Sequence, residues 1–257
     1  MTDIHQTAIV SPKAELADDI VVGPYTIIEE NVQIGPVCRI ASSVLIASGA
    51  RLGKNVRVAH GAVIGTEPQD LKFEGEESTA VIGDGTVVRE YATVNRGTKD
   101  RGETTVGKNC LLMAYSHTAH DCLIGDHVIM ANSVNLAGHI EIGDYAILGG
   151  VLPVHQFVKI GAHSMIGGGF RVQQDICPYA LVGGYPLKVM GLNAVGLRRR
   201  GFSNESLQAI ERAFKLLFFS GLNTTQAVER IKSDLEITPE IQVILRFIEQ
   251  STRGLVK

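Results

Sequence analysis

The chain of 257 residues contains no tryptophan, and its aromatic residues make up only 5% of the sequence. This scarcity leaves histidine as the conspicuous functional side chain. Neither sign of charge is in large excess, because the formal net charge is -3 and the sequence pI is near 6.2. The chain therefore has no overall basic field, and we expect neither nucleic-acid binding nor attraction to a membrane surface.

Long apolar runs and paired cysteines are absent as well. No stretch reaches the length of a bilayer span, and the first residues lack the basic start and apolar core of a secretory signal, so we expect a cytoplasmic protein without membrane insertion. The four cysteines, Cys38, Cys110, Cys122 and Cys177, form no C-x-x-C pair. We expect them to be reduced thiols, and we expect neither a metal site nor a cofactor.

A six-residue repeat dominates the first two thirds of the chain. Stepping by six from Val10 to Ile64 meets ten aliphatic residues without a miss, and the same register returns at 82–94 and again from Val106 to Val172. Only Thr118 breaks the aliphatic rule. Glycine often follows the register residue, which suits tight backbone geometry near a corner. Four places after the register residue comes a small or β-branched residue, a class that includes three of the cysteines.

Neither the 3.6-residue period of a helix nor the two-residue period of a strand pair explains this spacing. Three hexads make one 18-residue turn of a triangular coil, whose faces are short strands that stack about 4.8 Å apart as parallel ladders. The repeat predicts a parallel β-helix of about eight coils over residues 1–190. The period alone does not determine the hand of the coil.

Two insertions interrupt the repeat, near 66–80 and at 99–104. Insertions on a rigid scaffold often carry functional residues, although both are also compatible with plain solvated loops. From residue 191 to residue 257 the period is replaced by helical signals. We expect helices that begin at Ser203, at Thr225 and at Thr238–Pro239, forming a small helical domain. The start of this domain carries Arg199 and Arg200 in a cationic run, which could bind a phosphate group or an acidic carrier protein.

Five of the eight histidines lie between His117 and His155. With 18 residues per coil, His120, His139 and His155 are expected near one corner of successive coils, and His117 lies one segment earlier. Asp121 follows His120 and is placed to support its imidazole as a general base. Such a base can take a proton from a sugar hydroxyl that attacks an acyl thioester. The amide of Gly138 is a candidate oxyanion donor.

Several strings resemble those of the UDP-N-acetylglucosamine acyltransferases, which are hexapeptide-repeat enzymes. The strings occur in order along essentially the whole chain: Pro68-Gln69-Asp70-Leu71-Lys72, Asn95-Arg96-Gly97-Thr98, His117-Thr118-Ala119-His120-Asp121, Leu136-Ala137-Gly138-His139, Val154-His155-Gln156-Phe157, Arg199-Arg200-Gly201-Phe202 and Ser251-Thr252-Arg253-Gly254-Leu255. The hexad is common to many transferases, but this ordered set is specific.

The resemblance implies a left-handed β-helix and a homotrimer with active sites between neighbouring subunits. It also implies that acyl carrier protein delivers a 3-hydroxyacyl group to the 3-hydroxyl of UDP-N-acetylglucosamine, at the start of lipid A synthesis. In this scheme His120 is the base, Asp121 its partner and Gly138 the oxyanion donor. The positions that match those binding the sugar are Asp70, Lys72, His117, His139, His155 and Gln156. The positions that match the nucleotide and phosphate end are Asn193, Arg199 and Arg200.

Two further positions bear on the substrates. Gly168 matches the position that limits acyl length in the family, and glycine there leaves room for a longer chain. Asn95 stands where some members of the family carry histidine. The resemblance therefore does not determine the sugar group at this contact, and a 3-amino sugar nucleotide is an alternative acceptor.

Three other readings compete with this one. A zinc lyase of the γ-carbonic anhydrase type shares the scaffold and binds metal through histidines, but it leaves the arginine run and the C-terminal helices without a purpose. The N-acyltransferase that acts later in the same pathway carries an N-terminal uridine-binding domain, whereas the hexads here begin by Val10. A purely structural solenoid explains neither the His120-Asp121 pair nor the insertions.

Overall fold

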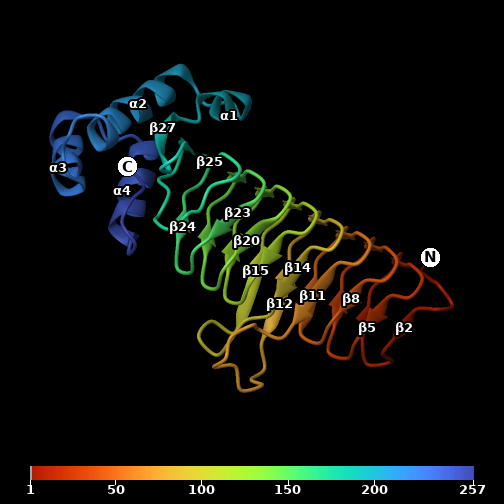
Figure 1. Cartoon of the computed structure of the whole chain (residues 1–257). Coiled ribbons are helices and arrows are strands. Elements are labelled where there is room, and N and C mark those ends of the chain that lie inside the picture. The colour runs from red at the N-terminus through yellow and green to blue at the C-terminus, as the bar shows by residue number, and fades with distance from the viewer. Residues whose placement is uncertain (1) are drawn as a thin grey trace.

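The computed structural model describes residues 2–257. Their strands form three sheets that make the three sides of a long prism, with the helices gathered at its C-terminal end (Figure 1). The prism is a parallel β-helix, as the hexad period predicts.

The sheets have eleven, eight and eight strands. In stacking order, the first sheet contains β1 (Asp3–Ile4), β4 (Val21–Val22), β7 (Arg39–Ile40), β10 (Arg57–Val58), β13 (Val87–Val88), β16 (Leu111–Leu112), β19 (Ile129–Met130), β22 (Ile147–Leu148), β25 (Met165–Ile166), β26 (Ala180–Gly183) and β27 (Lys188–Leu192). The second sheet contains β2 (Ile9–Val10), β5 (Ile27–Ile28), β8 (Leu45–Ile46), β11 (Val63–Thr66), β14 (Thr93–Asn95), β17 (His117–Thr118), β20 (Val134–Leu136) and β23 (Leu152–Val154). The third sheet contains β3 (Glu15–Leu16), β6 (Gln33–Ile34), β9 (Ala50–Leu52), β12 (Thr79–Ile82), β15 (Glu103–Val106), β18 (Leu123–Ile124), β21 (Glu141–Ile142) and β24 (Lys159–Ile160).

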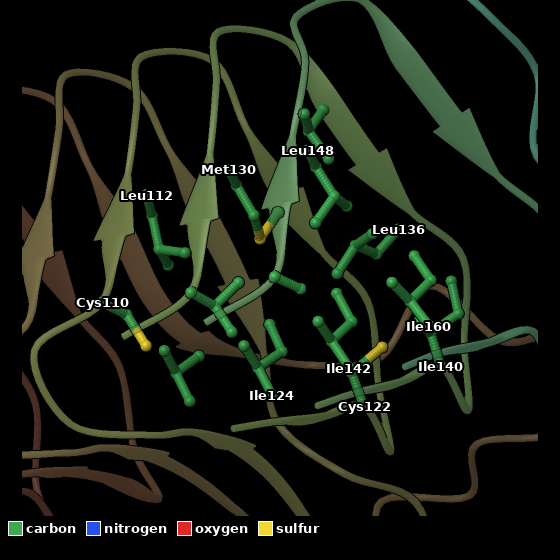
Figure 2. Close-up of a cluster of buried hydrophobic side chains, with 14 of the residues drawn as sticks. Cys110, Leu112, Cys122, Ile124, Met130, Leu136, Ile140, Ile142, Leu148 and Ile160 are labelled. Atoms are coloured by element: carbon green, nitrogen blue, oxygen red, sulfur yellow. The ribbon is translucent and has the colours of Figure 1, made fainter. Parts of the chain in front are cut away.

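The register residues build the core of the prism. Residues on the same side of successive coils stack in ladders, such as Leu112, Met130 and Leu148 (Figure 2). Cys110 and Cys122 lie in the inward positions predicted for small residues, and both are buried. Burying each large aliphatic side chain contributes about 1.5–3 kcal/mol, so the ladder supplies most of the driving force for coiling.

The corners use a backbone conformation that the sequence did not reveal. One residue at most corners has φ near +60°, and these residues are mostly not glycine; Asp121 (φ 59°) and His139 (φ 61°) are two of them. Apart from Gly65 (φ 88°), the glycines that follow the register residues do not adopt this conformation and instead allow close approach of the backbone. At Gly23, a Cβ atom would lie 2.7 Å from the carbonyl carbon of Ala41. Glycine there permits close approach of two coils, and the corner itself comes two residues later.

The two insertions leave the prism from the second sheet and return to the third. The first runs from the end of β11 to the start of β12, and the second from the end of β14 to the start of β15 (Figure 1). The ladder continues across both, since Val58 pairs with Val88 and Val88 with Leu112. The coils therefore stay in register while the loops project from one edge.

An antiparallel hairpin, β26–β27, ends the first sheet and leads into four helices. These are α1 (Ala194–Arg199), α2 (Asn204–Phe218), α3 (Thr224–Asp234) and α4 (Pro239–Gln250). The predicted caps of α2 and α4, Ser203 and Thr238, are confirmed. The prediction for α3 was wrong by two residues at the cap, because Asn223 caps this helix and forms a capping box with Gln226. The six-residue α1 was not predicted.

The end of the chain packs back onto the last coil. The buried carboxylate of Asp175 accepts a hydrogen bond of 2.6 Å from the Ser251 hydroxyl, and the Asp175 amide donates to the Gly254 carbonyl at 2.8 Å. The Ser251–Leu255 string thus fastens the helical domain to the β-helix. Within residues 2–257, no helix combines the length and apolarity required to cross a membrane.

Candidate active site

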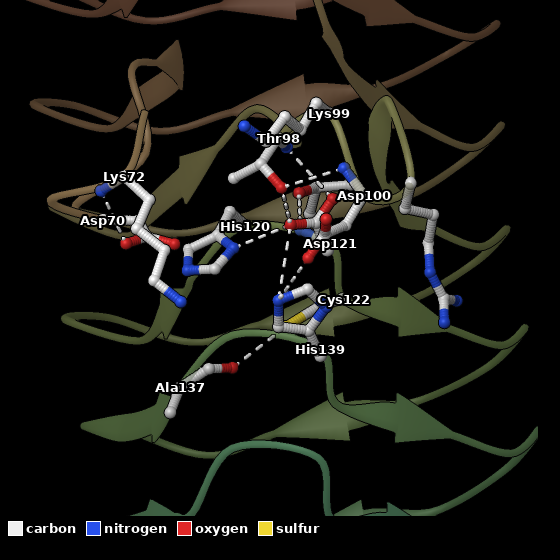
Figure 3. A network of polar contacts seen from close by, with 12 residues as sticks. Asp70, Lys72, Thr98, Lys99, Asp100, His120, Asp121, Cys122, Ala137 and His139 are labelled. Carbon is white, nitrogen blue, oxygen red and sulfur yellow. Dashed lines mark hydrogen bonds and ion pairs between the residues drawn. The ribbon is translucent and has the colours of Figure 1, made fainter. Parts of the chain in front are cut away.

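One corner, between the second and third sheets, carries the predicted histidine cluster. His120 and Asp121 follow β17, and Gly138 and His139 follow β20 on the next coil (Figure 3). The amide of His139 donates to the carbonyl of His120 at 3.0 Å, which fixes the two coils against each other at this point. The coiling therefore brings together side chains that lie 19 positions apart in the sequence.

Asp121 is the buried centre of the cluster. Its side chain has no exposed surface, and its Oδ2 atom lies 2.7 Å from Nδ1 of His120. Thr98 donates to the same carboxylate twice, from its hydroxyl to Oδ2 at 2.7 Å and from its amide to Oδ1 at 3.0 Å. Burial by itself raises the pKa of Asp121, but the hydrogen bonds from His120 and Thr98 outweigh it and hold the pKa below its ordinary value. Asp121 is therefore ionised at neutral pH.

The hydrogen bond to Asp121 determines which nitrogen of His120 is basic. A carboxylate only accepts hydrogen bonds, so Nδ1 of His120 carries a proton and Nε2 of the neutral ring carries the lone pair. Nε2 has no hydrogen-bond partner in the described part of the chain and is not sealed from solvent. The side chain as a whole is 11% exposed. His120 thus lies outside the hydrophobic core, largely buried at the corner, with its basic nitrogen available.

Gly138 lies directly against this imidazole. A Cβ atom at position 138 would be 2.6 Å from Nε2 of His120, so only glycine allows the approach. The Gly138 amide donates no hydrogen bond to another residue among 2–257. At the equivalent hexad position, the amides of Lys54 and Lys108 bind the carboxylates of Asp84 and Asp126, at 2.8 and 2.7 Å. This class of amide therefore suits an anionic oxygen, and at Gly138 no side chain occupies that position.

His139 completes the cluster. Its ring meets that of His120 edge-on at 5.1 Å and stacks on Phe157 at 4.6 Å. Its Nε2 lies 3.7 Å from Oδ2 of Asp121. The ligand atoms of His120, Asp121 and His139 all lie within 4.8 Å of one another, which is close enough to consider a metal ion. However, Nδ1 of His120 and Oδ2 of Asp121 already bind each other, so the pair is arranged as a hydrogen-bonded dyad rather than as separate ligands.

The other two histidines of the cluster lie beside this corner. His117, in β17, shares a hydrogen bond of 2.7 Å with the hydroxyl of Thr93, and burial lowers its pKa, with a smaller contribution from His120. It is therefore neutral at pH 7. His155 follows β23 on the next coil, and its Nδ1 contacts the carbonyl of Gln156 at 3.1 Å. Among residues 2–257, His155 forms no hydrogen bond or ring contact with His139.

The first insertion carries two of the predicted sugar-binding residues. Asp70 accepts a hydrogen bond of 3.0 Å from the amide of Lys72, and both residues are drawn with the cluster in Figure 3. Asn95 is only 3% exposed, and its amide group donates to the hydroxyl of Thr66 and to the carbonyl of Glu67, both at 2.9 Å. Asn95 therefore fastens the start of the first insertion, a structural role that the sequence did not indicate.

Residues predicted for the nucleotide end and for acyl length lie on other elements. Asn193 caps α1 and donates to the carbonyl of His163 at 2.9 Å. Arg200 covers the ring of Tyr145 at 5.1 Å and donates to its carbonyl, whereas Arg199 is exposed. Gly168 follows β25, where a Cβ atom would lie 2.7 Å from the carbonyl oxygen of Gly150. Within residues 2–257, none of these residues forms a hydrogen bond or ion pair with His120 or Asp121.

Sequence reasoning missed Thr98 and Thr104, which both hold Asp121. The hydroxyl of Thr104 accepts a hydrogen bond of 2.8 Å from the Asp121 amide. Thr98 was visible as the last residue of the Asn95–Thr98 string, but nothing in the sequence connected it with Asp121.

Two family models match the chain. One, described as bacterial transferase hexapeptide (six repeats), matches residues 103–138. The other, described as domain 2 of UDP-N-acetylglucosamine O-acyltransferase, matches residues 175–256. The three-sided coil, the His–Asp corner and these matches define the chain as a hexapeptide-repeat transferase.

Full-length relatives narrow the class. The acyl-[acyl-carrier-protein]–UDP-N-acetylglucosamine O-acyltransferase of Thermodesulfovibrio yellowstonii is 43% identical, and that of Leptothrix cholodnii is 48% identical, each over 100% of both chains. The solved UDP-N-acetylglucosamine acyltransferase of Bacteroides fragilis superimposes with a TM-score of 0.97 at 44% identity, over 99% of this chain and 100% of that one. The chain therefore belongs to the acyl-[acyl-carrier-protein]–UDP-N-acetylglucosamine O-acyltransferase family. The predicted fold, a left-handed parallel β-helix followed by a small helical region, is confirmed.

Proposed function

We propose that the protein transfers a 3-hydroxyacyl group from acyl carrier protein to the 3-hydroxyl of UDP-N-acetylglucosamine, the first step of lipid A biosynthesis. Membership of the family over the full length supports this function. The single structural observation that carries it is the His120–Asp121 pair, in which a buried carboxylate binds Nδ1 and leaves Nε2 free as a base.

The chemistry follows from that geometry. Nε2 of His120 takes the proton of the sugar hydroxyl as its oxygen attacks the thioester carbonyl. The amide of Gly138 donates to the oxyanion of the tetrahedral intermediate. When the intermediate collapses, the carbon–sulfur bond breaks, and the imidazolium returns the proton to the departing thiol of the carrier. Asp121 stabilises the imidazolium between these two proton transfers, and the residues of the chain supply the whole reaction without a cofactor.

Substrate binding is assigned to three groups of residues. The sugar and its acetamido group are assigned to Asp70, Lys72, Asn95, His117, His139, His155 and Gln156. The nucleotide and phosphate end is assigned to Asn193, Arg199 and Arg200. The acyl chain length is assigned to Gly168. The neutral state of His117 and the exposed guanidinium of Arg199 are compatible with a hydroxyl partner and a phosphate partner, respectively.

The functional unit is proposed to be a homotrimer in the cytoplasm. The site residues lie on an outer corner of the prism, where a neighbouring copy would convert an open edge into a closed pocket. Acyl carrier protein is then the transient partner, and it delivers the acyl chain to this edge.

Two observations keep alternatives open to test. The resemblance places Asn95 where some members of the family carry histidine, which favours examining a 3-amino sugar nucleotide as acceptor. The compact set of His120, Asp121 and His139 favours examining zinc, as in a lyase of the γ-carbonic anhydrase type. The second is disfavoured because the oxygen of Asp121 nearest the imidazoles already accepts hydrogen bonds from His120 and Thr98.

The experiment is a direct transfer assay. The purified protein is incubated with a panel of 3-hydroxyacyl carrier proteins and either UDP-N-acetylglucosamine or its 3-amino analogue, and products are identified by mass. An ester product on UDP-N-acetylglucosamine is expected. Product from the amino analogue alone would shift the assignment to N-acylation, and stoichiometric zinc together with no acyl product would favour the lyase.

A further inference from the structure

Two threonines at the ends of the second insertion bind the same aspartate. Thr98 directly precedes residues 99–104 and Thr104 is the last of them, in β15, and both are buried, with 5% and 0% of their surface exposed. Thr98 contacts the carboxylate of Asp121 (Figure 3), and Thr104 contacts its amide. We propose that the threonines of this insertion are positioning residues that hold Asp121 ionised and directed at His120.

The direction of each hydrogen bond supports this role. The hydroxyl of Thr98 accepts from the amide of Asp100 at 3.3 Å, so its own hydrogen is directed to Oδ2 of Asp121. The carbonyl of Thr98 accepts from the amide of Gly102 at 2.7 Å, which closes the loop on itself. The loop therefore fixes the Thr98 side chain as a donor, and a donor stabilises the charged form of the carboxylate.

The backbone of Asp121 also needs this support. Its φ of 59° lies in the left-handed region, which residues other than glycine adopt at a cost of about 1–2 kcal/mol. The hydroxyl of Thr104 binds the Asp121 amide at 2.8 Å and so favours this conformation. Thr98 and Thr104 thus hold both the conformation and the charge of the residue that orients the base.

The proposal rests on the proposed function, because a positioned carboxylate matters only if His120 acts as the base. It gives the second insertion a purpose beyond closing a loop, because Thr98 supplies two donors to one carboxylate, one from its amide and one from its hydroxyl. It also explains why the Asn95–Thr98 string ends on a residue with a hydroxyl group.

Thr98→Val removes the hydroxyl and keeps nearly the same shape, whereas Thr98→Ser keeps the donor. Thr105→Val is the matched control, since Thr105 lies next to Thr104 in β15 and its buried hydroxyl has no hydrogen-bond partner among the described residues. We expect kcat of Thr98→Val to fall by about tenfold or more while KM of both substrates stays within about twofold, as for loss of one charge-assisted hydrogen bond. Thr98→Ser and Thr105→Val should retain wild-type kcat.

The pH dependence separates positioning from general loss of structure. Without the Thr98 hydroxyl donor the pKa of Asp121 should rise toward its ordinary value, because the carboxylate loses a hydrogen bond that stabilises its charge. Carbon-13 titration of Asp121 in the wild type, Thr98→Val and Thr98→Ala measures the same change without turnover. If the wild type transfers no acyl group, the proposed function fails, yet the titration still tests the positioning. Unchanged titration of Asp121 in both variants, or a wild-type kcat in Thr98→Val, would overturn the proposal.

Discussion

The contact between Gly138 and His120 depends on a missing side chain. A methyl group at position 138 would lie 2.5–2.6 Å from two atoms of the imidazole, so the ring must move away from Asp121 or from the substrate. We expect Gly138→Ala to lower kcat by at least about tenfold, because small displacements of a catalytic group are costly. Steady-state kinetics on folded variants measure this.

Gly183→Ala is the matched control for that substitution. A Cβ atom at Gly183 meets its nearest neighbours at 3.8 and 3.9 Å, which is ordinary contact. Equal kcat values for Gly138→Ala and Gly183→Ala would show that the close approach to His120 has no catalytic consequence.

His163 gives the fold a dependence on pH. Its ring stacks between Tyr145 and Tyr179, and burial, reinforced by the nearby charge of Arg200, lowers its pKa from 6.5 to about 4. The unfolded chain binds a proton near pH 6.5, whereas the folded chain does so only near pH 4. The contribution of His163 to stability is therefore fully present above pH 6.5 and is lost as the pH falls toward 4.

His163→Phe keeps the stacking and removes the titration. We expect the urea midpoint of the wild type to fall more steeply between pH 6.5 and pH 4 than that of His163→Phe. Parallel midpoints across this range would contradict the assignment of a neutral, buried imidazole.

At the scale of elements, the proposed acyl-length determinant lies where two coils nearly touch. A Cβ atom at Gly168 would be 2.7 Å from the Gly150 carbonyl oxygen, so any side chain there must displace a coil or project from the corner. We expect Gly168→Met to shift the preferred acyl chain to a shorter one. The measurement is the product profile from mixed acyl carrier proteins, alongside thermal unfolding. An unchanged profile in a folded variant would remove Gly168 from this role.

The strands could be predicted from the sequence because their cause is local and periodic. Each register residue, such as Leu112 or Ile142, must be buried in every coil, and the six-residue spacing records that requirement directly. The corner conformation could not be predicted, because residues as different as Asp121 and Tyr145 adopt it. Their stability there comes from neighbouring coils, which the sequence of a single coil does not describe.

The start of a helix could be predicted where a single capping side chain marks it in the sequence. Ser203 and Thr238 cap their helices as expected, whereas Thr225 competed with Asn223, whose box with Gln226 places the start of α3 earlier. The short α1 depends on Asn193, which is held by the carbonyl of His163, 30 residues away in the sequence. Such a tertiary contact is invisible to a local pattern.

At the scale of the whole molecule, the sequence predicted that the histidines meet at one corner of the β-helix, but not the hydrogen bonds that hold this corner in place. Eighteen residues per coil placed His120 and His139 together, and the structure confirms their contact. Thr98 binds the carboxylate of Asp121, 23 residues away in the sequence, and Asn95 binds the carbonyl of Glu67, 28 residues away. No sequence period relates the residues of either pair. Those contacts are determined by the paths of the two loops.

The proposed trimer leads to a simple prediction. Mass measurement in solution should give three times the 27.6-kDa mass of the chain, for the wild type and for variants of His120 alike, because the imidazole is not part of the hydrophobic core. A species of single-chain mass that retains full activity would contradict a site shared between subunits.

The most direct test of the account is acyl transfer by His120→Ala, with the trimer mass and the unfolding temperature measured on the same sample. Loss of the general base should lower kcat by about 10²–10⁴-fold while both structural measurements match the wild type. Near-normal turnover from this variant would contradict the assignment of His120 as the base.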